Sequence, residues 1–505
     1  MSSNFGWIDF AVLVAYLGGS TAFGLWVGRN QKNATTYFVA DRDIPWWVVM
    51  FSVVATETSA LTFISIPGLS YLGNLGFLQI CAGYILGRIV VATVLLPRYL
   101  DGNLVTAYAL LNTRFGPATR RFTAVTFLAT RALADSVRIF ATAIPVALII
   151  GPVMPRESLM PVSILVVGFV TILYTYYGGM RAVIWTELIQ AAVYILGGVA
   201  AIYLLGRSTV GGWDGILSAA GDAGKLDMLN FSFTLSDPHT VWAGLLGGAF
   251  LAMASHGADQ LIVQRLLSAR SLRDAQRAVI GSGIVVFLQF ALFLAVGLGL
   301  WSAFGARTFA TTDAVFPTFI VEQMPTGLLG LIVAAIFAAA MSTQSGSINS
   351  LAATTTHDIY LPLTGRGADD PETLRAGKRF ALVWGIVLTF GALFYPEGRT
   401  PVVVIALSIA SFTYGALLGG FFLGIFVNRA RQRDAILGMS AGLVAMGLIV
   451  FAKLVGSAVP ALAPVLRPFE SIAWPWFVLI GTAVTVGTGT LSSLLWTRPS
   501  TPVRT

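Results

Sequence analysis

Apolar stretches of about 20 residues recur along this chain, and each is long enough to cross a lipid bilayer as a helix. The stretches are continuous rather than alternating, which argues against the strands of a β-barrel. Charged residues make up 11% of the chain, against about 25% in a soluble domain. The sequence therefore predicts an all-α, polytopic membrane protein.

The hydropathy pattern predicts about 13 transmembrane helices. Their expected ranges are 6–28, 46–72, 75–97, 118–150, 160–178, 183–206, 239–268, 278–304, 318–345, 377–396, 400–426, 434–454 and 471–496. Five fall within 46–206 and five within 239–426, and an odd number of spans inverts the second set relative to the first. We expect a single membrane domain over 1–505, in which this five-plus-five inverted repeat has one extra N-terminal and two extra C-terminal helices.

The net charge of +8 is explained by where the basic residues lie. If the N-terminus faces outside, the inner segments hold roughly three times as many Lys and Arg residues as the outer ones. This predicts an N-terminus outside and a C-terminus in the cytoplasm, in the plasma membrane (the bacterial inner membrane). The first apolar run has no basic segment before it and is expected to be a retained span. Expected partners are the lipid bilayer and a small solute, with no nucleic acid and no obligatory protein partner.

One predicted span contains a run of polar residues. In SVVATETSALTFISIPGLSY, residues 52–71, Thr56, Glu57, Thr58 and Ser59 follow one another. A carboxylate near the bilayer centre costs about 2.5 to 3.5 kcal/mol on insertion scales, so it should face a partner or a wet cavity. A helix broken at this depth would also present free carbonyls to that cavity. Glu57 either belongs to a binding site or pairs with an arginine of a neighbouring span.

A second stretch, AAAMSTQSGSINSLAATTTHDIY at residues 338–360, brings small polar residues together. On a helix, Ala339, Ser342 and Thr343 share one face. Two hydroxyls and a free carbonyl are neutral oxygen ligands that suit a monovalent hard cation, whereas calcium or magnesium would require carboxylates. A face of small residues is also typical of helix packing, so both interpretations remain open from this stretch alone.

Four blocks of the chain resemble, in order and spacing, the conserved blocks of the solute:sodium symporter family. They are IPWWVVMFSVVATETSALTFISIPGLSY, YYGGMRAVIWTELIQ, HGADQLIVQRLLSARSLRDAQ and AAAMSTQSGSINSLAATTTHDIY. The resemblance runs from about residue 44 to at least residue 425. It implies a LeuT-like five-plus-five core and import of a small organic solute by alternating access, driven by Na+.

The resemblance also implies which residues bind the shared sodium ion. These are the backbone carbonyls of Ala55, Thr58 and Ala339 and the hydroxyls of Ser342 and Thr343. Some members bind a second sodium through an aspartate and serines below the first site. Here the acid is Glu187, which would act with Ser345, and one serine position is Gly346. Because the acid is longer and one hydroxyl is missing, we expect one sodium ion.

The solute should lie where the two repeats meet and their helices are interrupted. Candidate solute ligands are Glu57, Ser59, Thr62, Phe77, Gln79, Arg138, His256, Asp259 and Gln260. An arginine inside a span is a functional candidate, and its planar fork matches a carboxylate. In family members that carry anionic sugars or acids, an arginine of the helix that corresponds to residues 118–150, the span of Arg138, holds the substrate carboxylate. We therefore expect a small organic anion. Arg138 could instead pair with Asp135 or Glu57, and His256 could be a packing residue.

Other functions remain as alternatives. The chain could be a proton-coupled symporter that uses Glu57 or Glu187, or a sodium-coupled carrier of sugars or amino acids. No H-E-x-x-H or G-x-S-x-G motif is present, so an enzyme is not expected. Cys81 is the single cysteine, which excludes an intrachain disulfide and a zinc site built from several thiolates.

Overall fold

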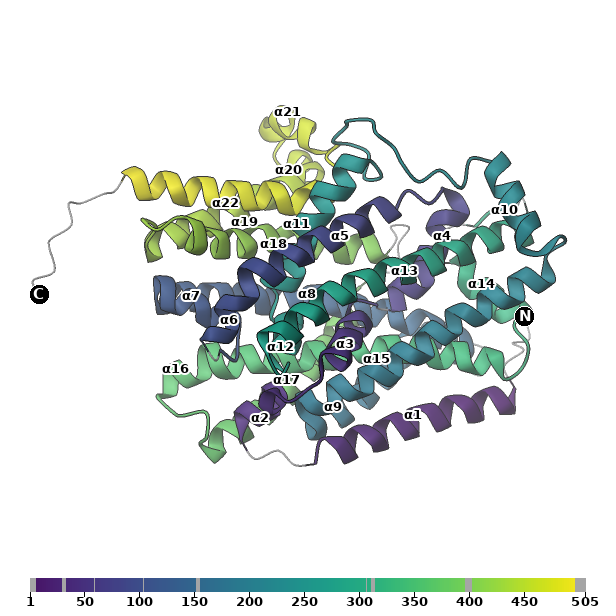
Figure 1. The fold of residues 1–505 in the computed structure, drawn as a ribbon, viewed down its shortest axis with the longest axis horizontal. Coiled ribbons are helices and arrows are strands. Elements are labelled where there is room, and N and C mark those ends of the chain that lie inside the picture. Colours follow the sequence, from purple (N-terminus) through teal and green to yellow (C-terminus); the bar gives the residue numbers. More distant parts are fainter. Residues whose placement is uncertain are drawn as a thin grey trace, which may run out of the picture.

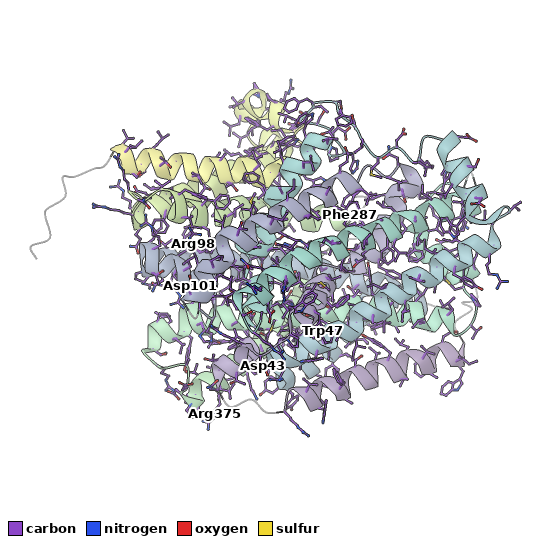
Figure 2. The ribbon with its side chains drawn as sticks, in the orientation of Figure 1. Asp43, Trp47, Arg98, Asp101, Phe287 and Arg375 are labelled. Atoms are coloured by element: carbon purple, nitrogen blue, oxygen red, sulfur yellow. The ribbon has the colours of Figure 1, made fainter. Side chains whose placement is uncertain are left out.

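A computed structural model describes residues 6–29, 33–58, 60–102, 104–150, 155–305, 307–309, 314–395 and 402–495, and within these ranges every regular element is a helix. The helices lie side by side in one bundle, with α1 (Trp7–Val27) along one side and α22 (Trp476–Leu495) along the opposite side (Figure 1). α1 begins and α22 ends at opposite ends of the bundle. Arg98 and Arg375, both expected to be cytoplasmic, lie toward the end at which α22 finishes (Figure 2).

The elements of the first half of the chain differ widely in length. They are α2 (Ala34–Val39), α3 (Trp46–Glu57), α4 (Ala60–Leu72), α5 (Leu78–Val90), α6 (Leu96–Asp101), α7 (Tyr108–Phe115), α8 (Pro117–Ile150), α9 (Arg156–Ser208) and α10 (Gly212–Asp222). The second half contains α11 (Gly248–Gly257), α12 (Gln260–Leu267), α13 (Leu272–Phe304), α14 (Val315–Gln323), α15 (Leu328–Thr354), α16 (Leu361–Thr364), α17 (Pro371–Ala392), α18 (Val402–Phe426), α19 (Gln432–Val450), α20 (Ala452–Ala458) and α21 (Ala463–Leu466).

Each of the thirteen predicted ranges overlaps a helix of the structure. Within the described residues, 7 helices are long and apolar enough to span a membrane on their own, and the bent pair α3–α4 brings the number to 8. The all-helical membrane fold is therefore confirmed, whereas the count of 13 is not established by length and hydropathy.

Two predicted boundaries differ from the structure. The ranges 160–178 and 183–206 form one helical run, α9, that changes direction at Gly179, where φ is 57°. Glycine is the residue that takes this conformation without strain. The range 318–345 is divided between α14 and α15. The buried carboxylate of Asp9 fixes the start of α15, because its Oδ1 accepts hydrogen bonds of 2.7 Å from the backbone amides of Gly327 and Gly330.

Two helices near the middle of the bundle are interrupted. α3 ends at Glu57, α4 begins at Ala60, and the two helices are bent by 64° relative to each other. α11 ends at Gly257, and α12 starts after Asp259, whose Oδ1 caps the new helix by accepting a 2.9 Å bond from the amide of Leu261. Each interruption falls in the first span of one predicted repeat. The repeat boundaries themselves stay a prediction.

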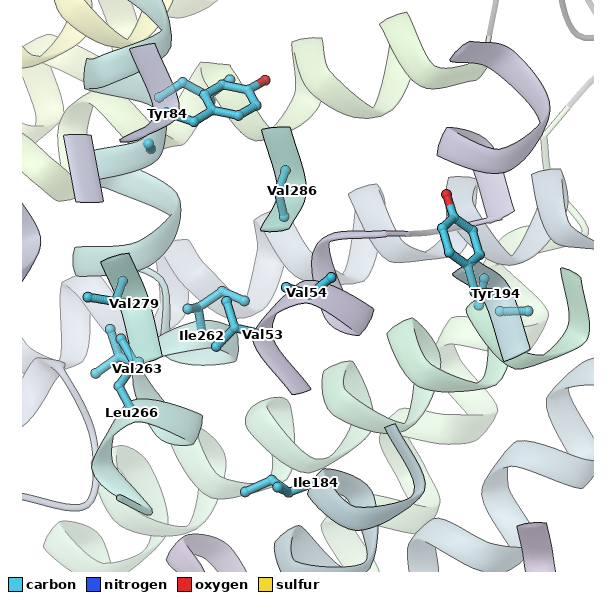
Figure 3. Close-up of a cluster of buried hydrophobic side chains, with 14 of the residues drawn as sticks. Val53, Val54, Tyr84, Ile184, Tyr194, Ile262, Val263, Leu266, Val279 and Val286 are labelled. Carbon is cyan, nitrogen blue, oxygen red and sulfur yellow. The ribbon is translucent and has the colours of Figure 1, made fainter. Parts of the chain in front are cut away.

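The interrupted helix α3 ends inside the hydrophobic core. Val53 and Val54 lie between Ile262 of α12 and Tyr194 of α9 (Figure 3). The core helix α15 is buried along nearly its whole length and packs most extensively against α9. The part of the polar stretch that lies in α15, residues 338–354, is therefore enclosed by other helices.

Candidate ion and solute site

The end of α3 supplies backbone oxygen atoms at the helix interruption. The last four carbonyls of a helix have no intrahelical partner. The amide of Thr58 satisfies the carbonyl of Val54 at 2.9 Å, and the chain then leaves the helix at Thr58, with φ −83° and ψ 85°. The carbonyls from Ala55 onward consequently lack a partner within α3 and can serve as ligands.

A small cavity joins this interruption to α15. It has about 10 Å³ of free space, which suits one ion or one water molecule. Its lining residues are Val54, Ala55, Thr58, Gln190, Ala191, Tyr194, Gln289, Ala339 and Ser342. Four of the five sodium ligands expected from the sequence thus surround one cavity. A space of this size is large enough for one monovalent cation such as Na+.

The fifth expected sodium ligand, Thr343, faces a different space. Its hydroxyl donates to the carbonyl of Ala339 at 3.2 Å. Its side chain lines a second small cavity together with Asp135, Arg138 and Gln344. The hydroxyl of Thr343 is therefore engaged within its own helix.

Gln289 of α13 is a cavity residue that the sequence analysis did not single out. Its Nε2 donates to the hydroxyl of Thr58 at 2.6 Å and lies 3.4 Å from the hydroxyl of Tyr194. The available signal was a glutamine inside the apolar span 278–304, because a buried amide in lipid needs hydrogen-bond partners.

Glu187 is completely buried and borders the same region. Its carboxylate accepts hydrogen bonds from Ser342 at 3.3 Å and from Thr56 at 3.1 Å, and it forms an ion pair with Arg265. Ser345, its expected companion, instead donates to the carbonyl of Ser342 at 3.1 Å. Glu187 is therefore held by a guanidinium.

Glu57 forms an ion pair with Arg88 of α5, which is the second of the two interpretations considered for this carboxylate. Arg88 is fully buried and also donates to the hydroxyl of Ser282 at 2.8 Å. Nε2 of His256 lies 3.6 Å from Glu57 Oε2. Arg88 was not among the expected site residues, although an arginine within span 75–97 was a signal of a buried partner.

A second charged cluster joins α8 to the start of α12. Asp259 accepts from Arg131 and, at 2.6 Å, from the hydroxyl of Tyr414 on α18. Arg131 also contacts Asp135 at 3.2 Å, and Arg138 contacts the same carboxylate at 3.2 Å. Arg131 is almost completely buried, whereas 22% of the side chain of Arg138 is exposed.

The remaining expected solute ligands make other contacts. Thr62 is buried on α4, and Phe77 stacks on Phe290 with ring centroids 5.3 Å apart. Gln79 donates to the carbonyl of His239 at 2.9 Å. Gln260 donates to the carbonyl of Val105 at 3.0 Å and accepts from the amide of residue 107. Ser59 lies outside the described residues.

Comparison with known proteins assigns this arrangement to a family. The model of the sodium:solute symporter family matches residues 37–442. The chain is 30% identical to the sodium/sialic acid symporter NanT of Aliivibrio fischeri over 88% of this chain and 87% of that relative. It is 29% identical to the sodium/sialic acid symporter SiaT of Proteus mirabilis over 88% of this chain and 89% of that relative.

A solved structure of a Na+-coupled sialic acid symporter is also similar, in a substrate-bound outward-open state that revealed a novel Na+ site. The TM-score is 0.83 at 27% identity, and the match covers 98% of this chain and 99% of that one. These relatives are transporters rather than enzymes, and Na+ is their coupling ion. The chain therefore belongs to the sodium:solute symporter family and is a multi-pass, Na+-coupled membrane symporter.

Proposed function

We propose that this symporter imports a small sugar acid or a related organic carboxylate together with one sodium ion. Arg138 carries the proposal, because among the described residues its side chain donates only to Asp135 and keeps 22% of its area exposed. Its guanidinium thus retains donors for a further carboxylate. The three buried arginines of the site are less available, since Arg88 is bound to Glu57, Arg131 to Asp259 and Arg265 to Glu187. The sialic acid carried by the relatives is an anion of this class.

Sodium would bind between α3 and α15, at the carbonyls of Ala55, Thr58 and Ala339 and the hydroxyl of Ser342, whereas the hydroxyl of Thr343 faces a second cavity and is not assigned to the ion. The cavity that four of these residues line supports the assignment. An ion there joins the interrupted helix to the core helix and so favours the arrangement in which the solute site is formed. By linkage, each ligand then raises the affinity for the other by the same factor. A membrane potential of 100 mV contributes about 2.3 kcal/mol for each inward charge.

Proton coupling through Glu57 or Glu187 is the second candidate function. Each of these carboxylates already contacts a fully buried guanidinium. Protonation of either would leave a buried arginine without its counter-charge, which is strongly unfavourable. These ion pairs favour sodium over protons as the coupling ion. The basic inner loops support an orientation with the N-terminus outside and the C-terminus in the cytoplasm.

Uptake by purified protein in proteoliposomes tests both parts of the proposal. We expect an inward sodium gradient to drive accumulation of labelled sialic acid, and an imposed pH gradient without sodium to drive none. N-acetylmannosamine, a related sugar without a carboxylate, should compete poorly. Uptake driven by the pH gradient alone would assign the coupling to protons.

Arg138→Gln tests the proposed role of the guanidinium. Because a charge-assisted hydrogen bond contributes about 1.5 to 3 kcal/mol, KM for the anion should rise about tenfold or more. Arg121→Gln is the matched control, since Arg121 is an exposed arginine on the same helix. If N-acetylmannosamine is transported as well as sialic acid, and Arg138→Gln changes KM for neither compound, the substrate is not recognised through its carboxylate.

A further inference from the structure

The carboxylate of Glu187 lies where four helices meet. It belongs to α9 and accepts hydrogen bonds from Ser52 and Thr56 of α3 and from Ser342 of α15. The fourth helix, α12, contributes Arg265. Three hydroxyl groups around a carboxylate form the oxygen environment that a hard cation prefers.

Arg265 supplies the positive charge within this cluster. Its Nη2 lies 2.5 Å from Oε1 of Glu187, and its Nε lies 3.1 Å from Oε2, so the contact is bidentate. Its Nη1 donates to the carbonyl of Leu261. The side chains of Glu187 and Arg265 are both 0% exposed. A buried carboxylate needs such a counter-charge, and the guanidinium provides it from within the chain.

Gly346 makes room for this guanidinium. A Cβ atom added at position 346 would lie 2.2 Å from Nη2 of Arg265 and 3.1 Å from its Cζ. Serine, or any other residue with a side chain, would therefore displace the guanidinium from its observed position. Gly346 is one helical turn after Ser342, so both residues lie on the face of α15 that is directed at Glu187.

We propose that the Glu187 cluster is a monovalent cation site that this chain fills permanently with the guanidinium of Arg265. Ser52, Thr56 and Glu187 would provide the oxygen ligands, since the hydroxyl of Ser342 is assigned to the transported sodium, and an external sodium ion cannot enter while the tethered charge is present. The inference rests on the proposed function and adds to it that the cavity between α3 and α15 takes the single sodium of the transport cycle. Replacing Arg265 by alanine and introducing a serine hydroxyl at position 346 should convert the cluster into a second sodium site.

Equilibrium binding of radiolabelled sodium to the purified full-length protein tests the inference directly. We expect one bound ion per wild-type molecule and two per molecule of the variant Arg265→Ala with Gly346→Ser. The matched control adds Glu187→Gln to this variant, which removes the carboxylate and should return the count to one. Arg265→Lys keeps a tethered cation and should also bind one ion.

The inference is overturned if the wild type binds two ions, or if the folded variant without Arg265 gains none. A wild type that binds no sodium would instead contradict the proposed function. If the variant with Gly346→Ser does not fold, Arg265→Gln with Gly346 retained replaces it. Sodium should then raise the melting temperature of Arg265→Gln more than that of Arg265→Gln with Glu187→Gln, and equal shifts would count against the site. If neither variant folds, the number of sodium ions bound per wild-type molecule tests the inference: one supports it and two overturn it.

Discussion

Gln289 donates a hydrogen bond of 2.6 Å from Nε2 to the hydroxyl of Thr58, and so joins α13 to the point at which α3 is interrupted. Both residues line the cavity to which we assign the sodium ion. Thr58 has left helical geometry, so its conformation depends on contacts with neighbouring helices. The glutamine thus positions a residue whose carbonyl is a proposed ligand.

Gln289→Leu should weaken sodium binding without abolishing transport. Loss of one buried hydrogen bond is expected to cost about 1 kcal/mol, so the half-saturating sodium concentration should rise about fivefold. The sodium dependence of solute uptake measures this change. Thr58→Ser, which keeps the accepting hydroxyl, should stay close to wild type. An unchanged sodium dependence in Gln289→Leu would show that the bond plays no part in ion binding.

Ser342→Ala should raise the half-saturating sodium concentration about tenfold or more, because it removes a proposed ligand to a charged ion. Ser347→Ala is the matched control. Ser347 is a buried serine on the same helix whose hydroxyl donates to the carbonyl of Thr343 at 2.9 Å, and it does not line the cavity. Adding Thr343→Ala to give a double variant should change the sodium dependence little further, because the side chain of Thr343 faces another cavity. If that double variant responds to sodium normally, the ion is bound elsewhere.

Glu57→Gln should destabilise the protein by about 3 to 5 kcal/mol, because it leaves the fully buried Arg88 without its counter-charge. Thermal unfolding in detergent measures the loss. The double variant Glu57→Gln with Arg88→Met removes both charges and should recover much of the stability. A single variant as stable as the double one would mean that the ion pair is not needed to compensate Arg88.

Lys225→Met should loosen the C-terminal end of α4. The ammonium of Lys225 donates to the carbonyls of Ser70, Tyr71 and Gly73 at 3.3, 2.7 and 3.0 Å, and so satisfies the last turn of the helix. Amide hydrogen exchange of residues 70–75 should be faster in the variant. Lys453→Met, at an exposed lysine, is the control and should leave that exchange unchanged. Equal protection in both variants would contradict the capping role.

Hydropathy was sufficient to predict the helical membrane fold and the approximate place of the long apolar helices, because an apolar side chain partitions into lipid wherever it lies in the chain. It placed the boundaries less well. The turn in α9 depends on the positive φ of Gly179, and the start of α15 depends on Asp9 more than 300 residues earlier. Contacts of that separation leave no local pattern in the sequence.

The sequence by itself determined that two polar segments, at residues 52–71 and 338–360, had to avoid lipid and meet a partner or a cavity. Only the tertiary structure decided which partners those were. In the folded protein, Glu57 forms an ion pair with Arg88 and Glu187 forms one with Arg265. The side chain of Thr343 lines a different cavity from the one that Ser342 lines. The physical reason is that insertion free energy is a property of each segment, whereas the pairing of buried charges depends on which helix faces come together.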